Sequence, residues 1–276
     1  MVGLVTDSLA GVPEDIARRE DIEIVPVDLI IEGRVYKDLV DIKPKEFYDI
    51  LRRSKELPKT AAPPPSDFIK AFEKMRRKYD EILCLTVHSS LSGTYSSALK
   101  AKEIFGSNIE VIDSGTAVGG QMWMALRIRE EAKKGAGVER LKKIADKMRE
   151  KVNVVVMLET LKYLVKGGRV PKAASLITSI LKIKPVLELK GEVKLLSRER
   201  TRRRGMERLV KIIEERRDGE KLFLNIMHGD CEEEALRLGE ELGRKFPVSE
   251  LIISYFTPVV GTHTGPGALG FAFYWE

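Results

Sequence analysis

Apolar runs and helical repeats alternate along the first half of the chain. The apolar runs cover residues 2–5, 22–31, 82–87 and 109–112. Helices are predicted to begin at Pro13 and to cover residues 44–53, 66–79, 93–105, a long stretch ending near Lys134, and 138–149. Because successive strand–helix units favour parallel pairing, we predict an α/β domain with a parallel, Rossmann-like sheet.

The helix predicted over residues 66–79 has the clearest pattern. Phe68, Ile69, Phe72 and Met75 recur at three- and four-residue intervals, which places them on one helical face. Ser66 stands at the start of this stretch, where its hydroxyl can accept a hydrogen bond from an unpaired backbone N–H. We therefore predict that Ser66 caps the helix and that the helix packs one face on a core.

The pattern changes after a glycine-rich break at residues 135–137 and the helix that follows it. Residues 173–183 predict a helix that is apolar on most of its surface. Residues 184–189 and 193–197 predict a hairpin around a turn at 190–192, and therefore an antiparallel pair. The remainder predicts a helix over 201–217, a strand over 222–227, a helix over 232–245, a strand over 251–256, a glycine-rich loop and a strand over 269–275. We predict two α/β domains, residues 1–150 and 151–276, the second an α/β layer with a mixed sheet.

Charge and cysteine content narrow the class of protein. The 276 residues include 48 basic and 42 acidic side chains, a net charge of +6 that is too balanced for a nucleic-acid-coating tail. Cys84 and Cys231 are far apart and typical of free thiols in a reducing compartment, so we expect a cytoplasmic protein. No apolar run approaches the roughly 18 residues of a membrane span. The many charged residues beside a single glutamine resemble thermophilic composition.

Three predicted strand-to-helix turns carry small oxygen-bearing side chains, at residues 6–8, 89–94 and 113–116. In a parallel sheet such turns lie at the carboxyl ends of the strands, where ligands bind. In the middle turn, Ser92 and Thr94 offer hydroxyls at a helix N-terminus, which favours a carboxylate or a phosphate. Gly93 would let that anion approach the backbone. The alternative is ordinary helix capping without a ligand.

The glycine-rich loop at residues 261–267 is a second candidate, because it places His263 among glycines and threonines. A histidine can bind an anion when protonated, donate one hydrogen bond when neutral, or act as a base. The alternative is a histidine that only caps a turn. His88 and His228 stand at strand ends without such a setting, which favours structural roles for both.

Other chemistries fit the residues less well. A hydrolase with Ser92 as nucleophile and His263 as base needs a GxSxG pattern, but residues 90–94 read Ser-Leu-Ser-Gly-Thr. His228, Asp230 and Cys231 come from one turn and make a poor metal shell, so we expect no metal. The patterns GxxxxGK[ST] and GxGxxG are absent, which argues against a self-contained nucleotide enzyme.

Residues 198–204 carry five arginines and one glutamate, and so most of the net positive charge. Such a cluster can bind phosphate groups, an acidic protein surface or RNA, but it is equally typical of a solvated helix start. No aromatic side chain interleaves the arginines, so bases would have nothing to stack on. We therefore expect no nucleic-acid partner.

Several motifs follow one another along essentially the whole chain. They are Val5-Thr6-Asp7-Ser8, Val25-Pro26, Tyr36-Lys37-Asp38, Thr60 followed by Pro63, Ser89-Ser90-Leu91-Ser92-Gly93-Thr94-Tyr95, Asp113-Ser114, Leu161-Lys162-Tyr163-Leu164, Gly167-Gly168-Arg169, Lys184-Pro185-Val186-Leu187, Arg200-Thr201 and His263-Thr264-Gly265-Pro266-Gly267. In this order they resemble the DegV family of fatty-acid-binding proteins. That family usually has Thr-Ser-Gln-Pro where this chain has Thr60-Ala61-Ala62-Pro63.

The resemblance implies a ligand tunnel between the two domains that holds a long-chain fatty acid such as a C16–C18 acid. Thr60 and Ser92 match the ligands of the carboxylate, and His263 matches the supporting histidine. Gly93 and Thr264 belong to the same predicted site. The apolar helix predicted over residues 173–183 could line the pocket for the acyl tail.

The resemblance also implies a carrier without catalytic activity of its own. Members of the family present the bound fatty acid to a separate fatty-acid kinase, which phosphorylates the carboxylate. Arg169 and Arg200 match arginines that steer the kinase or contact the acyl phosphate. No cofactor is expected besides the bound ligand. A serine-dependent esterase or acyl hydrolase at the same cleft is the alternative function.

Overall fold

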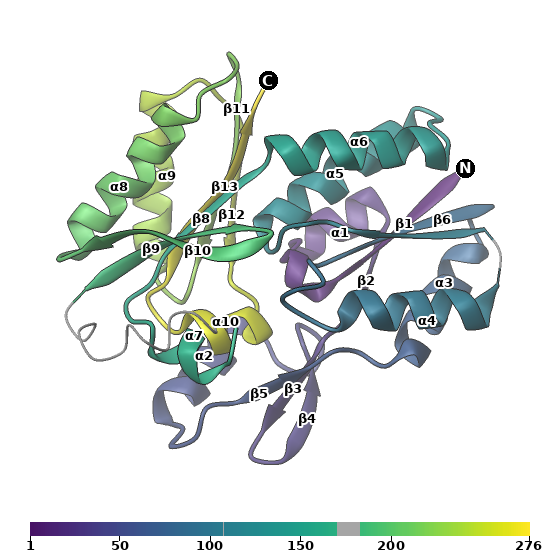
Figure 1. The fold of residues 1–276 in the computed structure, drawn as a ribbon, viewed down its shortest axis with the longest axis horizontal. Coiled ribbons are helices and arrows are strands. Elements are labelled where there is room, and N and C mark those ends of the chain that lie inside the picture. Colours follow the sequence, from purple (N-terminus) through teal and green to yellow (C-terminus); the bar gives the residue numbers. More distant parts are fainter. Residues whose placement is uncertain (107, 170–182) are drawn as a thin grey trace.

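The strands of residues 1–106, 108–169 and 183–276, which the computed structural model describes, form three sheets (Figure 1). The first sheet has the order β2-β1-β6-β7, and all its strands run parallel. Its strands are β1 (Val2–Asp7), β2 (Ile22–Val25), β6 (Glu81–Thr86) and β7 (Ile109–Asp113). The predicted parallel sheet of the first half is therefore confirmed.

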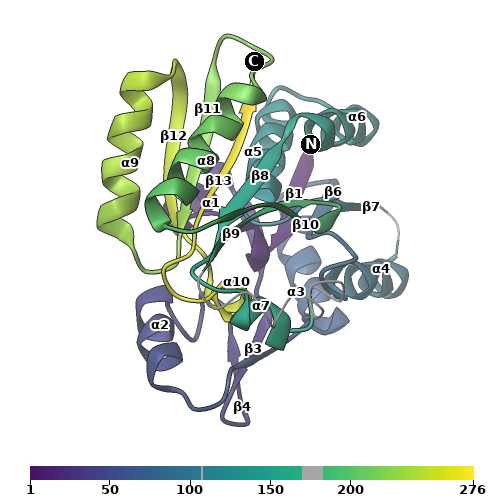
Figure 2. The same ribbon diagram turned by 60° about the vertical axis from the view of Figure 1, so that its left-hand side comes forward.

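Helices cover both faces of this sheet. They are α1 (Glu14–Glu20), α3 (Pro65–Arg76), α4 (Thr94–Phe105), α5 (Gly119–Lys133) and α6 (Val138–Lys151). Phe68 and Phe72 of α3 join Val5 and Cys84 of the strands in one buried cluster, so the helical face expected from the sequence is the packed one. The other face of the sheet carries α5, and α6 packs on α5 (Figure 2).

The predicted N-cap of α3 is wrong. The helix begins at Pro65, Pro64 occupies the capping position, and Ser66 lies inside the first turn. Proline suits the first helical position because its φ is already helical and the missing N–H would have no helical partner. The proline run therefore starts the helix before Ser66 is reached.

The second sheet has six strands in the order β10-β9-β8-β13-β11-β12. They are β8 (Asn153–Met157), β9 (Lys184–Lys190), β10 (Glu192–Glu199), β11 (Leu222–His228), β12 (Val248–Tyr255) and β13 (Leu269–Trp275). β11 and β12 pair in parallel, and the other neighbours are antiparallel. The predicted mixed sheet and the β9–β10 hairpin are both confirmed, with Gly191 at a φ of 71° in the turn.

Two helices, α8 (Arg202–Glu215) and α9 (Glu232–Lys245), pack on one face of the second sheet (Figure 1). The other face packs on α5, where the Trp123 indole N–H donates to the Ala272 carbonyl at 3.0 Å. On the side of α5 that faces the first sheet, the Gln121 side-chain amide donates a hydrogen bond to the Thr6 hydroxyl at 3.0 Å. One helix thus serves the cores of both halves. The division between residues 150 and 151 stays a prediction, and the chain crosses from α6 to β8 at this point.

A third, antiparallel sheet was not predicted. It has the order β4-β3-β5, with β3 (Asp28–Ile31), β4 (Arg34–Lys37) and β5 (Lys59–Ala61), and α2 (Pro44–Arg53) stands between β4 and β5 in sequence. The apolar run at residues 22–31, which looked continuous, is divided by Pro26 between β2 and β3. Proline lacks the N–H that a central strand needs, so the run splits between two sheets.

The glycine-rich loop expected at residues 261–267 is also wrong in part. Residues Pro258–Thr264 form the short helix α10, which the Thr257 hydroxyl caps by accepting from the Val260 N–H. Gly265, at a φ of 76°, ends it. A second short helix, α7 (Lys162–Lys166), packs on α10. The apolar helix predicted over residues 173–183 lies outside the described residues, apart from Ile183.

Within the described ranges, every helix is too short or too polar to cross a bilayer.

Candidate ligand-binding site

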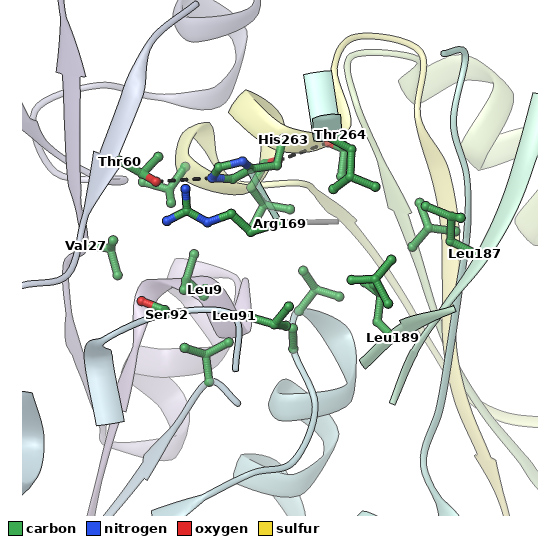
Figure 3. A pocket seen from close by; sticks show the side chains of 18 of the residues that line it. Leu9, Val27, Thr60, Leu91, Ser92, Arg169, Leu187, Leu189, His263 and Thr264 are labelled. Carbon is green, nitrogen blue, oxygen red and sulfur yellow. Dashed lines mark hydrogen bonds between the residues drawn. The ribbon is translucent and has the colours of Figure 1, made fainter. Parts of the chain in front are cut away.

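A cavity of about 140 Å³ lies between the two large sheets, with α10 at one side (Figure 3). The first half of the chain lines it with side chains from the ends of its strands, and the second half lines it with β8, the β9–β10 hairpin and α10. The apolar lining residues are Leu9, Val27, Ala61, Ala62, Val87, Leu91, Ala117, Val118, Val156, Leu158, Leu164, Leu187, Leu189, Val193, Val259 and Val260. Such a wall suits a hydrocarbon chain.

The polar side chains that line this cavity are all ones that the sequence analysis singled out. Among the described residues they are Thr60, Ser92, Arg169, His263 and Thr264, and Gly93 lies with them. These residues come from β5, the turn before α4, the segment after α7, and α10. The fold thus brings the predicted site residues together, although they span the chain from residue 60 to residue 264. Arg200 is exposed and lies outside the cavity lining.

The Thr60 hydroxyl and His263 Nε2 lie 3.1 Å apart and form a hydrogen bond across 203 residues of sequence (Figure 3). Thr60 is in the middle of β5, which pairs with β3, and His263 is in the last turn of α10. Which of the two atoms donates depends on the tautomer of the imidazole. This contact joins the third sheet to α10 at the cavity wall.

His263 is neutral at pH 7. Burial, with a smaller contribution from the positive charge of Arg169, lowers its pKa to about 4. Its Nδ1 is buried and has no hydrogen-bond partner among the described residues. Gly167 packs against this nitrogen so closely that a Cβ at Gly167 would lie 2.2 Å from it. The histidine can therefore donate or accept one hydrogen bond at the site, but it brings no positive charge.

Arg169 supplies positive charge instead. Among the described residues that line the cavity, it is the only lysine, arginine, aspartate or glutamate. One of its guanidinium nitrogens, Nη1, donates to the Gly167 carbonyl at 2.7 Å. Figure 3 shows its side chain reaching in beside Thr60 and His263. An anion in the cavity would thus meet a cation in surroundings of low dielectric constant.

Ser92 approaches the cavity from the other side (Figure 3). Its hydroxyl lies 2.7 Å from the Thr94 hydroxyl and accepts from the Thr94 N–H at 3.3 Å. Gly93 is the N-cap of α4 and has no side chain to cap the helix. A hydroxyl pair at a helix N-terminus attracts a carboxylate or a phosphate. The middle hydroxyl-rich turn thus stands where a ligand can reach it.

The first and third hydroxyl-rich turns serve the fold instead. The Thr6 hydroxyl donates to the Leu85 carbonyl at 2.7 Å, and the Ser8 hydroxyl donates to Asp38 at 2.7 Å. In the third turn the Ser114 hydroxyl donates to the Thr116 carbonyl at 3.0 Å. All four residues Thr6, Ser8, Ser114 and Thr116 are buried and none of them lines the cavity.

The remaining candidates also have structural partners. His88 Nδ1 lies 3.0 Å from Asp113, and the His228 ring packs against the Tyr255 ring at a tilt of 52° with centroids 4.1 Å apart. Arg202 of the arginine cluster is half-buried and forms ion pairs with Glu159 and Glu234. No cluster of three or more histidine, cysteine or acidic side chains with metal-site geometry occurs in the part of the chain that the structure describes.

Sequence reasoning missed the hairpin as a wall of the cavity. Leu187 and Leu189 of β9 and Val193 of β10 line it. Alternation along β9 was the available signal, because residues 187 and 189 lie on the same face of a strand. Gly167 belongs to the Gly167-Gly168-Arg169 motif, but the sequence around it does not indicate that His263 packs on it.

Comparisons with known proteins identify the family of this chain. The family model described as "Uncharacterised protein, DegV family" matches residues 1–276. Protein DegV of Bacillus subtilis is 32% identical over 274 residues, which cover 98% of this chain and 97% of that protein. A DegV domain-containing protein of Listeria innocua is 31% identical over 275 residues, 98% of this chain and 96% of that protein.

Solved structures give the same answer. The crystal structure of DegV from Bacillus subtilis, described as a fatty acid binding protein, has a TM-score of 0.91 at 31% identity and covers 100% of this chain and 99% of that one. A DegV family protein from Thermus thermophilus, described by its fatty acid binding, has a TM-score of 0.91 at 29% identity with the same coverage. The chain therefore belongs to the DegV family.

Proposed function

We propose that this protein binds a long-chain fatty acid in the cavity between its sheets, with the carboxylate held by Thr60, Ser92 and His263. The observation that carries the proposal is the segregation of the lining, which is apolar except for a few polar side chains that include Thr60, Ser92, Arg169 and His263. Relatives in this family whose structures are solved are described as binding fatty acids. An acyl chain suits the apolar wall and its carboxylate suits the polar group.

The energetics favour such a ligand. Each methylene that the cavity buries contributes roughly 0.8 kcal/mol before ordering costs, so an acyl chain gains affinity with every carbon that it places there. A carboxylate needs compensation for leaving water. Arg169 offers charge, and the hydroxyls of Thr60 and Ser92 offer hydrogen bonds. The alanines at positions 61 and 62 face the same cavity, so the head group lies beside an apolar surface there.

Mass spectrometry of the purified protein, native and then after solvent extraction, tests the proposal. We expect one fatty acid for each chain. Ser92→Ala and His263→Ala should each weaken palmitate binding about tenfold, the scale of one hydrogen bond to a charged group. Ser96→Ala is the control for the serine, because Ser96 is exposed on α4 outside the cavity. His88→Ala is the control for His263→Ala, because the His88 side chain pairs with Asp113 and does not line the cavity. An empty protein that also refuses added palmitate would refute the proposal.

A serine-dependent esterase is the alternative at the same cleft. The hydrogen bonds favour binding over catalysis, because His263 pairs with Thr60 and Ser92 pairs with Thr94. A nucleophilic serine needs its base within hydrogen-bond reach. Turnover of a fatty acyl ester that disappears in Ser92→Ala would favour the esterase.

We further propose that the protein acts in the cytoplasm as a carrier that presents its fatty acid to a separate kinase. The kinase would transfer a phosphoryl group from a nucleoside triphosphate to the carboxylate. Arg200 is exposed and outside the cavity, as a contact for a partner should be. Arg200→Ala should keep palmitate binding and slow phosphorylation of the bound acid. Arg237→Ala, an exposed arginine of α9, is the control, and equal phosphorylation rates in both variants would contradict this role.

A further inference from the structure

Among the described residues, two hydrogen bonds join α10 to the third sheet and to the residue after β4, and only one of them lies at the cavity. The first is the 3.1 Å hydrogen bond between Thr60 and His263 at the proposed site. The second is a 3.1 Å hydrogen bond from the Val259 N–H to Oδ1 of Asp38, the residue directly after β4. Asp38 is 1% exposed and does not line the cavity. The two contacts hold the same pair of structural units together.

We propose that Asp38 is a positioning residue of the fatty-acid site, which holds α10 where His263 reaches Thr60. This inference rests on the proposed function and deepens it. Asp38 touches no ligand in this scheme and acts through α10.

The carboxylate of Asp38 ties three segments together. Its Oδ2 accepts from the Ser8 hydroxyl at 2.7 Å, and that hydroxyl oxygen accepts from the Val27 N–H at 3.1 Å. The Asp38 N–H donates to the Val27 carbonyl at 3.0 Å. Val27 and Leu9, the neighbour of Ser8, both line the cavity. The hydrogen bonds of Asp38 therefore hold both the segments that carry Leu9 and Val27 of the cavity wall and the helix α10.

The short helix α10 needs such an anchor. It has seven residues, and isolated helices of that length are unstable in water. In its first turn, Asp38 accepts from the Val259 N–H and the Thr257 hydroxyl accepts from the Val260 N–H. At the other end, Gly265 packs on the Tyr163 ring, where a Cβ would lie 2.3 Å from a ring carbon. Both ends are held, so the position of His263 between them is determined.

Burying the Asp38 carboxyl costs stability. Burial, partly offset by its hydrogen bonds, raises its pKa to about 7, and the neighbouring carboxyl of Asp7 adds to this rise. An uncharged side chain would avoid that desolvation cost. One oxygen accepts from the Ser8 hydroxyl and the other accepts from the Val259 N–H, so a single side chain links both segments.

The test compares palmitate affinity and the free energy of unfolding in four variants. Asp38→Ala removes both acceptors and should weaken palmitate binding about tenfold. Asp38→Asn keeps an acceptor for the Val259 N–H and should bind within about twofold of the original chain. Ser8→Ala keeps the carboxyl but removes one of its supports, and should weaken binding about threefold. Ser8→Ala also tests the positioning role if Asp38→Ala does not fold.

Asp41→Ala is the matched control. Asp41 is exposed, belongs to the same loop, and accepts from the Lys37 N–H at 2.7 Å, so its removal disturbs a local backbone contact without touching α10. Palmitate affinity should stay unchanged in this variant. Unchanged affinity in both Asp38→Ala and Ser8→Ala would overturn the inference.

A second measurement separates this inference from the proposed function. Nitrogen-15 NMR of the His263 imidazole in ligand-free protein reports whether Nε2 still bonds Thr60. Asp38→Ala should shift the Nε2 resonance, and Asp38→Asn and Asp41→Ala should not. If the original chain binds no palmitate but this shift occurs, the proposed function fails and the positioning role stands. An unshifted Nε2 resonance in Asp38→Ala contradicts the positioning role whatever the ligand.

Discussion

Gly167 places its backbone directly against the imidazole of His263. Its φ of −73° is ordinary, so a side chain would meet no backbone strain, and only the 2.2 Å approach of a Cβ to Nδ1 opposes one. We predict that Gly167→Ala displaces the ring and weakens palmitate binding roughly tenfold, because overpacking costs about 1–3 kcal/mol. Isothermal titration would measure the change.

Gly137→Ala is the control for this prediction. Gly137 has a φ of −78°, and a Cβ there would meet nothing within 4 Å. Its replacement should leave binding unchanged. Equal affinity in Gly167→Ala and Gly137→Ala would show that the ring tolerates the displacement.

The neutral state of His263 makes stability depend on pH. Its folded pKa of about 4 lies below the ordinary value of 6.5, so the unfolded chain binds more protons between these values. The free energy of unfolding should therefore fall as the pH falls from about 6.5 to about 4, by up to about 3 kcal/mol. Urea unfolding at pH 7 and pH 5 would measure this fall.

His263→Gln removes the titrating group and should flatten this part of the profile. Asp7 and Asp38, whose folded pKa values are raised to about 6 and about 7, contribute the opposite slope. Both carboxyls are present in both chains, so their contribution cancels in the comparison. Parallel profiles for the two chains would mean that His263 titrates normally.

The helix α5 packs between two sheets, and its glycines reflect this. A Cβ at Gly119 would lie 2.2 Å from the Asn225 side-chain oxygen and 2.7 Å from the Ala272 Cβ. We predict that Gly119→Ala lowers the free energy of unfolding by about 1–3 kcal/mol, because this side of α5 cannot move away from β11 and β13. Chemical denaturation would measure it.

Gly243, in α9, provides the contrast. It is also helical, but it is exposed and a Cβ there would meet nothing within 4 Å. Gly243→Ala should raise the free energy of unfolding by about 0.5–1 kcal/mol, since alanine loses less backbone entropy on folding. The same sign of change in both helices would contradict the packing argument for α5.

The molecule as a whole encloses the cavity between sheets from its two halves. A ligand there contacts both halves, and binding to the folded state alone must stabilise that state. Palmitate at a free concentration of about 100 times its Kd should raise the free energy of unfolding by about 2.7 kcal/mol. Thermal unfolding followed by circular dichroism would detect this as a higher Tm.

The alcohol 1-hexadecanol is the comparison for palmitate, because it has the same chain length and lacks the charged carboxylate. Its smaller effect on Tm would assign part of the affinity to Arg169 and the hydroxyls. If palmitate raises the Tm of Ser92→Ala and His263→Ala as much as that of the original chain, the ligand binds elsewhere.

Local patterns in the sequence determined most of the elements, and the order of motifs along the chain led to the proposed site residues. The apolar face of α3, the β9–β10 turn and the succession of strands and helices in the first half were predictable, because periodicity and turn chemistry depend on near neighbours. The motif order indicated the family, and with it Thr60, Ser92 and His263, all of which line one cavity.

Only the tertiary structure decided how those pieces are used. The run at residues 22–31 divides because its two parts pair with strands of different sheets. The helix α10 forms where a loop was expected, and its Val259 N–H donates to Asp38, 221 residues earlier in the chain. The neutrality of His263 follows from burial and from Arg169. Each of these depends on partners far away in the chain, which no local pattern contains.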